Sequence, residues 1–451
     1  MSSTLSTERW IQAGSSIASR PWLPPKAPAG EWPLMGAIVD AAYLVGLLAS
    51  SPVLVPRMLR RGKHRIDWKA RLGRGESLPQ AAAPRILIHG VSVGEINAIR
   101  QLVDRLLTDT PAREVVVAST TTTGLARART LYSERCSVVQ YPLDFSSSVS
   151  RFLDRIQPDL FASVELELWP NFTRACVRRG IPQIVVNGRL SERSFRGYRR
   201  VRPLIRPMFK RVDQVGVQDD VYADRFRQLG ADSDSIVITG TMKWDTARVE
   251  DDVSGSSELA ESMGIDRSRP LIVAGSTAPD EHLLLHQATP KGVQLLCAPR
   301  RPEWFDQAAH ILKGCARRSR SDSRSATDRY LLDTMGELRA AYALADVVVV
   351  GRSFGELHGS DMMEPAALGK PVVVGPATGD FQLTVDALSQ AGGILVSSQE
   401  RLAEDLATLI SRADLRSDLS KRAREVVIAQ QGATSRTLEI ISRQLEGRKT
   451  P

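Results

Sequence analysis

The stretch PRILIHGVSVGE, residues 84–95, places a short apolar run directly before a turn that contains two glycines and an acidic residue. The run Arg85–Val91 is rich in aliphatic residues, which predicts a buried strand, and the residues after it have the pattern of a helix start. The same alternation of short apolar runs with longer helical patterns continues along the chain. Such alternation predicts βαβ units and a parallel sheet.

The pattern occurs in two successive halves, so we predict an α/β fold of two Rossmann-like domains, residues 76–245 and 246–451. The charged, Ser-rich stretch Asp245–Arg269 lacks a strand pattern and is interpreted as the interdomain linker. The segment from about Ser411 to the end is helical and could fold back on either domain. Further strands are expected at Glu114–Ser119, Ser137–Gln140, Leu160–Val164, Gln183–Asn187, Gln214–Gln218 and Ser235–Thr239, then at Pro270–Ala274, Val293–Ala298, Tyr330–Leu332, Asp346–Val350, Pro371–Val374 and Ile394–Ser397.

The composition is that of a globular protein, with 42% hydrophobic and 25% charged residues among 451. The net charge of +9 favours polyanions, whether nucleic acid, an anionic membrane or a phosphorylated substrate. With only 5% aromatic residues, a surface that stacks nucleic-acid bases is not suggested. The four cysteines form no CxxC pair, which argues against a zinc site or a disulfide framework. His282 and His286 share a helical spacing that allows a metal or a simple solvated face.

The N-terminus divides into two parts. Residues 1–35 are rich in Ser, Ala and Pro and predict a poorly ordered tail. Residues 36–75 combine the apolar run Gly36–Pro56 with a basic segment, which predicts a membrane-anchor helix followed by cations that face anionic lipids. An amphipathic helix packed on the protein is the alternative, and Asp40 weakens the spanning interpretation. The basic residues are Arg57, Arg60, Arg61, Lys63, Arg65, Lys69, Arg71 and Arg74.

In parallel α/β sheets, ligands bind beyond the carboxyl ends of the strands. At the first such turn, Glu95 is either an N-terminal charge that the helix dipole stabilises or a general base. After a later buried strand, Glu165 and Glu167 alternate with leucines and precede Trp169. Two carboxylates there are costly without partners, so a site is favoured over ordinary helix-start acids.

A third turn, Asn187–Ser194, is followed by a series of arginines. These arginines predict either a solvated basic helix or a patch for the phosphates of a membrane-bound acceptor. The arginines are Arg196, Arg199, Arg200, Arg202 and Arg206.

The strand ends of the second half carry hydroxyls, arginines and helix starts, the groups that bind a nucleotide phosphate, although helix caps alone account for any single turn. Glu364 could hold ribose hydroxyls. The chain has no GxxxxGK[ST] and no GxGxxG, which argues against a P-loop enzyme and against NAD or FAD. The turns are Ser276-Thr277, Pro299–Glu303, Asp333–Leu338, Gly351–Ser353 and Gly359–Pro365.

The strings HGVSVGE, ELELWPN, NGRLSERS, DTMGEL and EPAALGKP, in this order, resemble the lipid A-specific 3-deoxy-D-manno-octulosonic acid (Kdo) transferase family. The resemblance runs from about Tyr43 to near the C-terminus and implies a GT-B fold with an N-terminal membrane anchor. It also implies an enzyme of lipopolysaccharide synthesis that moves Kdo from CMP-Kdo to a lipid A precursor, with inversion and without a metal. The expected location is the cytoplasmic face of the bacterial inner membrane, with an anionic membrane surface and no nucleic acid as partner.

The resemblance also assigns residues. Glu95 takes the place of the catalytic base, and Glu165 and Lys243 take the places of groups that stabilise the transition state. In contrast to the family pattern, Ser360 and Asp361 stand at a His and an Asn position, and Ala278 and Arg301 at two further His positions. The residues implied in donor binding are Ser276, Pro299, Arg300, Met335, Gly336, Glu337, Asp361, Met362, Met363 and Glu364.

Two alternatives remain at this point. One is a nucleotide-sugar epimerase of the same fold, and the other is a membrane-associated homologue that has kept the fold and lost catalysis.

Overall fold

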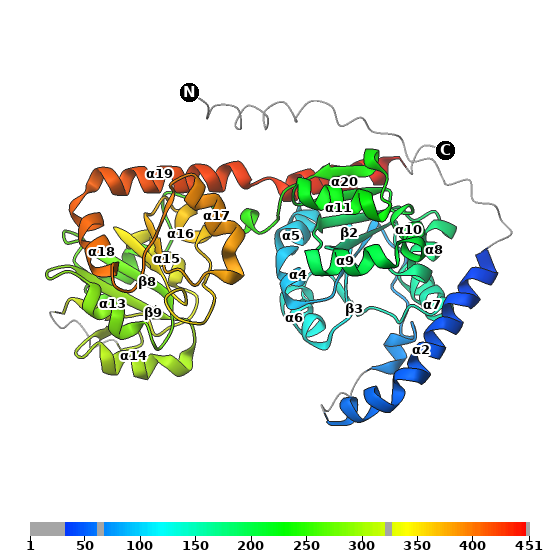
Figure 1. Ribbon diagram of the computed structural model, residues 1–451, viewed down its shortest axis with the longest axis horizontal. Coiled ribbons are helices and arrows are strands. Elements are labelled where there is room, and N and C mark those ends of the chain that lie inside the picture. Colours follow the sequence, from blue (N-terminus) through cyan, green and yellow to red (C-terminus); the bar gives the residue numbers. More distant parts are fainter. Residues whose placement is uncertain (1–31, 61–66, 321–326, 448–451) are drawn as a thin grey trace. The chain divides into compact units, whose positions relative to one another are not determined.

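The structure is a computed structural model that describes residues 32–60, 67–320 and 327–447. It consists of two compact units, one of residues 1–242 together with 432–451 and one of residues 243–431 (Figure 1). The predicted N-terminal tail lies outside the described residues up to residue 31.

The first unit is built on a seven-stranded sheet whose strands all run parallel, in the order β3-β2-β1-β4-β5-β6-β7. Its strands agree with the predicted ones to within one or two residues at each end. They are β1 Arg85–Gly90, β2 Glu114–Ser119, β3 Ser137–Gln140, β4 Leu160–Val164, β5 Gln183–Gly188, β6 Gln214–Val217 and β7 Ile236–Ile238. The helices of this unit are α2 Trp32–Arg60, α3 Trp68–Arg71, α4 Val93–Ala98, α5 Arg100–Thr108, α6 Thr122–Tyr132, α7 Ser146–Ile156, α8 Pro170–Arg178, α9 Glu192–Arg200, α10 Arg202–Phe209, α11 Asp220–Leu229 and α20 Ala433–Glu446, with a short 3-10 turn at Ser233–Ser235.

Both faces of the central strands are buried, as a parallel sheet requires. Ile86 and Ile88 of β1 pack on one face with residues of α5, α6 and α20, whereas Leu87 packs on the other face with residues of α7 and α8. Each face therefore has its own apolar core, and β1 alternates between the two.

The second unit has the same architecture. Its parallel sheet has the order β10-β11-β9-β8-β12-β13-β14, and the two-residue strand β10 is too short for the sequence pattern to reveal. The strands are β8 Leu271–Thr277, β9 Gln294–Pro299, β10 Ala316–Arg317, β11 Arg329–Leu331, β12 Val347–Val350, β13 Val372–Val374 and β14 Ile394–Val396. The helices are α12 Ser256–Met263, α13 His282–Ala288, α14 Phe305–Ile311, α15 Leu338–Leu344, α16 Met363–Ala367, α17 Gln382–Gln390, α18 Leu402–Ser411 and α19 Ala413–Gln430, with 3-10 turns at Trp244–Thr246, Pro302–Trp304 and Gly379–Phe381.

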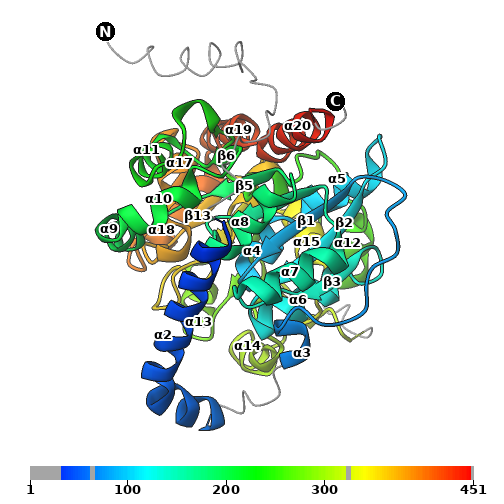
Figure 2. The same ribbon diagram turned by 90° about the vertical axis from the view of Figure 1, so that its right-hand side faces the viewer.

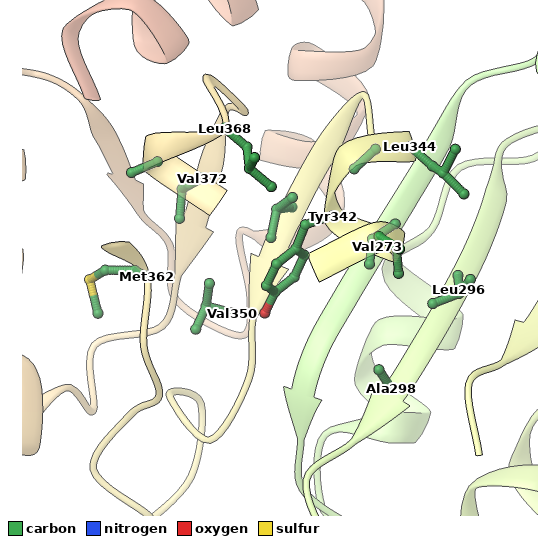
Figure 3. Packing of buried hydrophobic residues seen from close by; sticks show 14 of the residues in the cluster. Val273, Leu296, Ala298, Tyr342, Leu344, Val350, Met362, Leu368 and Val372 are labelled. Atoms are coloured by element: carbon green, nitrogen blue, oxygen red, sulfur yellow. The ribbon is translucent and has the colours of Figure 1, made fainter. Parts of the chain in front are cut away.

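Tyr342 lies in the middle of the larger core of this unit. Figure 3 shows its ring between strand residues such as Val273 and Val350, with Met362 on the loop beyond. The side chain is 1% exposed, and its hydroxyl would be 2.0 Å from a Cβ added at Gly275. Gly275 is therefore required by the close approach of Tyr342 to the end of β8.

Two predicted boundaries differ from the structure. The stretch Asp245–Arg269 is not a linker, because α12 buries Leu259 and Met263 in the core of the second unit. Residues 246–451 do not all belong to one domain either, because α20 buries Leu438 and Ile441 in the core of the first unit, beside α5, β4 and β5 (Figure 2). The chain therefore passes between the units twice, at Met242–Lys243 and at Gln431–Gly432.

The helix α2 contacts α7 and α8 of the first unit along one narrow face (Figure 1, Figure 2). Asp40 accepts hydrogen bonds from the Ser146 backbone at 3.0 Å and from the Asn171 amide at 2.8 Å. One turn later, the Tyr43 hydroxyl donates to Asp144 at 3.0 Å. Burial raises the pKa of Asp144 to about 6, against the lowering effect of the Asn171 and Phe172 N–H groups and of Tyr43. Asp40, which weakened the interpretation of this helix as membrane-spanning, thus attaches α2 to the first unit.

Other apolar side chains of α2 are exposed, with Ile38 55%, Leu44 54%, Val45 66% and Leu48 73% exposed. Within the described ranges, no helix combines the length and the hydrophobicity that crossing a bilayer demands.

We expect Tyr43→Phe to weaken the attachment of α2. The change deprives the buried Asp144 of one donor, which costs about 1.5 kcal/mol and corresponds to about tenfold faster amide exchange in α2. Hydrogen exchange measured by mass spectrometry checks this, with Leu44→Ala on the exposed face as the control that leaves the exchange unchanged. Equal exchange in Tyr43→Phe and the parent protein would contradict the anchoring role.

Candidate active site

Each sheet reverses its strand order once, between β1 and β4 in the first unit and between β8 and β12 in the second. Such switch points are where ligands bind in open α/β sheets. Backbone strain gathers at the same edges, because non-glycine residues with positive φ stand at or just beyond several strand ends. These residues are Glu165, Asn187, Ser276 and Arg352.

Glu95 lies at the carboxyl end of β1, in the first turn of α4, and is 8% exposed. Its Oε2 accepts from the Val91 backbone at 2.8 Å, and its Oε1 accepts from the Ser92 backbone at 3.2 Å and the Ser92 hydroxyl at 2.8 Å. The Ser92 hydroxyl in turn accepts from the Glu95 N–H, which completes a capping box. The capping role foreseen for this residue is thus present, and the same contacts fix the carboxylate at the strand end.

Glu165 and Glu167 follow β4, the strand next to β1. Leu166 and Leu168 pack on the apolar cluster around Phe195, so the two carboxylates take the other side, as the alternation predicts. Arg189, just after β5, forms an ion pair with Glu165 at 3.3 Å. Glu167 accepts from the Trp169 indole N–H at 3.2 Å and leaves that ring 37% exposed.

The three carboxylates Glu95, Glu165 and Glu167 interact electrostatically. Burial, followed by the charge of Glu95, raises the pKa of Glu167 to about 7, with a further rise from Glu165 and a lowering by the Trp169 hydrogen bond. A carboxyl group poised near neutral pH beside a second carboxylate is a typical arrangement of proton-transfer sites. The motif ELELWPN contains both Glu165 and Glu167. The alternation of acids and leucines could not show that burial raises the pKa of Glu167 in particular.

The ring of His89 stacks on Tyr141, with centroids 3.6 Å apart, and Tyr141 interacts electrostatically with Glu167. Burial, and next the nearby Arg71, lowers the pKa of His89 to about 3, so this histidine is neutral at physiological pH. His89 Nε2 lies 2.9 Å from the Thr120 hydroxyl.

In the second unit, several residues that the sequence implied in donor binding surround Tyr342. Burial raises the pKa of its hydroxyl, Glu364 and Asp361 raise it further, and Arg300 and Ser276 oppose the rise. Ser276 is near the end of β8 and Arg300 directly follows β9, whereas Asp361 precedes α16 and Glu364 is in its first turn, so the fold brings together residues that are far apart in the sequence. Tyr342 itself is in α15, where nothing in the sequence distinguishes it from a core residue.

Lys243 is exposed and interacts with Asp361 electrostatically, which lowers the pKa of that carboxyl against the larger raising effect of desolvation. Asp361 is solvent-accessible although crowded, and it accepts from the Met363 N–H at 2.8 Å. Glu364 forms an ion pair with Arg339 at 3.8 Å. Two cations, Lys243 and Arg339, and two carboxylates therefore lie along this part of the second unit.

The other residues that the resemblance implied in donor binding differ in how much of each is accessible to a ligand. Met335 is 62% exposed, and Gly336 has a φ of +97° in the same turn. Glu337 instead pairs with the Arg318 guanidinium at 2.8 Å, so it holds the turn in place. Pro299 ends β9 and is buried, and the side chains of Met362 and Met363 are in the core, which leaves only their backbone for a ligand.

His282 and His286, the two histidines with helical spacing, bind different partners. His282 is buried with Nε2 2.9 Å from the Thr277 hydroxyl, whereas His286 Nδ1 accepts from the Arg329 guanidinium at 3.1 Å. Among the residues that the structure describes, no three His, Cys, Asp or Glu side chains gather as a metal site would require.

Two parallel sheets, each with polar groups at its switch point, define the architecture of two-domain GT-B glycosyltransferases. A solved structure of this architecture, a glycosyltransferase from Rickettsia africae ESF-5, is similar with a TM-score of 0.52 and 13% identity, covering 82% of this chain and 100% of that one. The fold class is therefore confirmed as two Rossmann-like units of the GT-B type.

Sequence comparison defines the family. The model of "3-Deoxy-D-manno-octulosonic-acid transferase (kdotransferase)" matches residues 66–246. A 3-deoxy-D-manno-octulosonic acid transferase from Bordetella pertussis is 32% identical over 88% of this chain and 98% of its own length. The enzyme of that name from Haemophilus influenzae is 30% identical over 80% of this chain and 87% of its own. The chain belongs to the 3-deoxy-D-manno-octulosonic acid transferase family.

We expect Glu167→Gln to stabilise the protein in a pH-dependent way. Because the folded pKa of Glu167 lies above its ordinary value of 4.5, ionisation of this group destabilises the native state as the pH rises from about 4.5 to 7. The glutamine still accepts from Trp169 and avoids this cost, so the gain is about 3 kcal/mol at pH 8 and vanishes below pH 4.5. Urea unfolding at several pH values measures it.

Glu134→Gln, at an exposed position after α6, is the matched control with no such dependence. A gain from Glu167→Gln that stays constant between pH 4.5 and 8 would contradict the raised pKa.

Proposed function

We propose that this protein is an inverting glycosyltransferase that moves Kdo from CMP-Kdo to a lipid A-type acceptor in lipopolysaccharide synthesis. The observation that carries the proposal is the group of three carboxylates at the ends of β1 and β4, in a chain 32% identical to a Kdo transferase over almost its whole length. These carboxylates stand where an acceptor hydroxyl can be deprotonated.

Glu95 is the proposed base. It removes a proton from an acceptor hydroxyl, and the oxygen forms a bond to the anomeric carbon of Kdo while the bond from that carbon to the CMP phosphate breaks. The capping contacts of Glu95 hold its carboxylate in one orientation and use its lone pairs only in part. Glu165, held by its ion pair with Arg189, stabilises the positive charge that develops on the sugar. Glu167 shares the abstracted proton with Glu95 or passes it on.

The second unit is the proposed donor site. CMP leaves with an additional negative charge, which Lys243 and Arg300 are proposed to offset; their electrostatic interactions with Asp361 and Tyr342 support this role. Glu364 and Ser276 are proposed to bind ribose and phosphate oxygens, with Asp361 and the exposed turn of Met335 and Gly336 completing the pocket. We propose that no metal ion takes part, because these two cations can provide the charge that a metal would otherwise supply.

Glu95→Gln is expected to lower the rate of CMP release by at least about 100-fold with little change in donor affinity, because it removes the base. The assay combines the protein with CMP-Kdo generated in place and a lipid A precursor, and follows CMP release together with the lipid mass. Glu134→Gln is the control and keeps parent activity, and addition of EDTA leaves the parent rate unchanged.

Near-normal turnover in Glu95→Gln would contradict the base assignment. Conversion of a nucleotide sugar in the absence of any acceptor would contradict transfer altogether and indicate an epimerase.

The protein is proposed to act at the cytoplasmic face of the bacterial inner membrane. The exposed apolar face of α2, at Ile38, Leu44, Val45 and Leu48, supports contact with acyl chains, and the arginines of α9 and α10 support binding of the acceptor phosphates. We expect the protein to float with vesicles that contain anionic lipid and Leu44→Asp to weaken this. A protein that stays behind in the gradient contradicts this location.

A further inference from the structure

Glu281, between β8 and α13, accepts four backbone hydrogen bonds. Oε2 accepts from Ala278 at 2.8 Å and from Arg352 at 2.8 Å, and Oε1 accepts from Ser353 at 2.9 Å and from Phe354 at 3.1 Å. The residue is 1% exposed, and it plays no part in the mechanism above. A single buried carboxylate therefore satisfies one N–H group at the end of β8 and three consecutive ones beyond β12.

These four contacts bridge the switch point of the second sheet, because β8 and β12 are the neighbouring strands at which its order reverses. The approach is close enough to require glycine at residue 351, where a Cβ would lie 2.8 Å from Glu281 Oε2 and 2.6 Å from the Thr277 Cα. From Ser353 the hydrogen bonds continue, since its hydroxyl accepts from Gly375 at 2.8 Å just after β13. Glu281 thus links the ends of β8 and β12 directly and that of β13 through Ser353.

Glu95 is the counterpart in the first unit, since it also stands four to five residues after the end of the first strand of its sheet. Its backbone donors are Val91 and Ser92, both in its own turn. Glu281 instead reaches to the neighbouring strand. The same place in the fold therefore holds a carboxylate proposed for catalysis in one unit and a bridging carboxylate in the other.

Consecutive backbone N–H groups beyond a strand end are the usual cradle for an anion in a Rossmann-like fold. In this protein Glu281 fills that cradle with its own carboxylate. Burial raises the pKa of Glu281, and the four N–H groups act against this. A donor phosphate therefore has to be bound by side chains and by other turns.

We propose that Glu281 is a positioning residue for the donor site: it takes the place of a phosphate in the N–H cradle between β8 and β12, and so fixes the turn of Arg352–Phe354 against which CMP binds. This rests on the proposed function, because the ligand is taken to be CMP. The strained Arg352, with a φ of +60°, is held by the same contacts.

The first test uses the unmodified protein. Hydrogen exchange with and without CMP is followed in peptides that cover residues 276–282 and 350–356. We expect the amides of Ala278, Arg352, Ser353 and Phe354 to exchange slowly without CMP and to gain no protection when it is added. New protection of these amides on CMP binding would overturn the proposal, because the nucleotide would then be taking the N–H groups.

The second test uses Glu281→Gln and Glu281→Ala, with Glu404→Gln, an exposed position on α18, as the matched control. We expect CMP to bind about tenfold or more weakly to both variants, the KM for the donor to rise, the KM for the acceptor to stay unchanged, and millimolar formate to restore CMP affinity to Glu281→Ala alone. A purely structural role would reduce the amount of active protein and leave both KM values unchanged, and formate would then not help.

The outcomes separate the two proposals. A parent protein that does not bind CMP in calorimetry contradicts the proposed function. A parent protein that binds CMP, together with a Glu281→Gln variant that binds it equally tightly, contradicts only the role of Glu281. If neither variant folds, the exchange measurement on the parent protein decides whether Glu281 or CMP occupies the four N–H groups.

Discussion

Parallel pairing of every strand is the constraint on which the rest of this structure depends. It buries both faces of the central strands, so charged groups can be accommodated only where the strands end. It also places all carboxyl ends of a sheet at one edge, so residues that are far apart in the sequence become neighbours there. The carboxylates Glu95, Glu165 and Glu167 of the first unit are consequently found at that edge, as are Ser276 and Arg300 of the second unit.

Carboxylates placed in this way are stable only with partners, and the two units meet that requirement differently. Glu95 and Glu281 are satisfied mainly by backbone N–H groups, whereas Glu165 has an arginine. Glu167 accepts a hydrogen bond from the Trp169 indole and has two acidic neighbours, and burial together with these neighbours raises its pKa to about 7. A buried carboxyl group whose pKa is raised this far destabilises the folded protein when it ionises. Its position beside Glu95 therefore supports a functional role.

The sequence predicted the strands well, because buried strands rich in valine and isoleucine are a local pattern. It did not predict that α12 is part of a core or that α20 returns to the first unit, because both depend on contacts between distant residues. The same reason applies to the site. The positions of Glu95 and Glu165 at strand ends followed from local motifs, whereas the depth of Glu167, the cradle filled by Glu281 and the central place of Tyr342 come from tertiary packing alone.

The return of α20 has a consequence for how the protein is made. Residues of α20, Leu438 and Ile441 among them, complete a core whose other buried members lie between residues 86 and 242. During synthesis the ribosome finishes the entire second unit before these two residues emerge. Part of the core of the first unit therefore stays uncovered until α20 has been synthesised, and a chain that stops at residue 431 would leave that apolar surface exposed to aggregation.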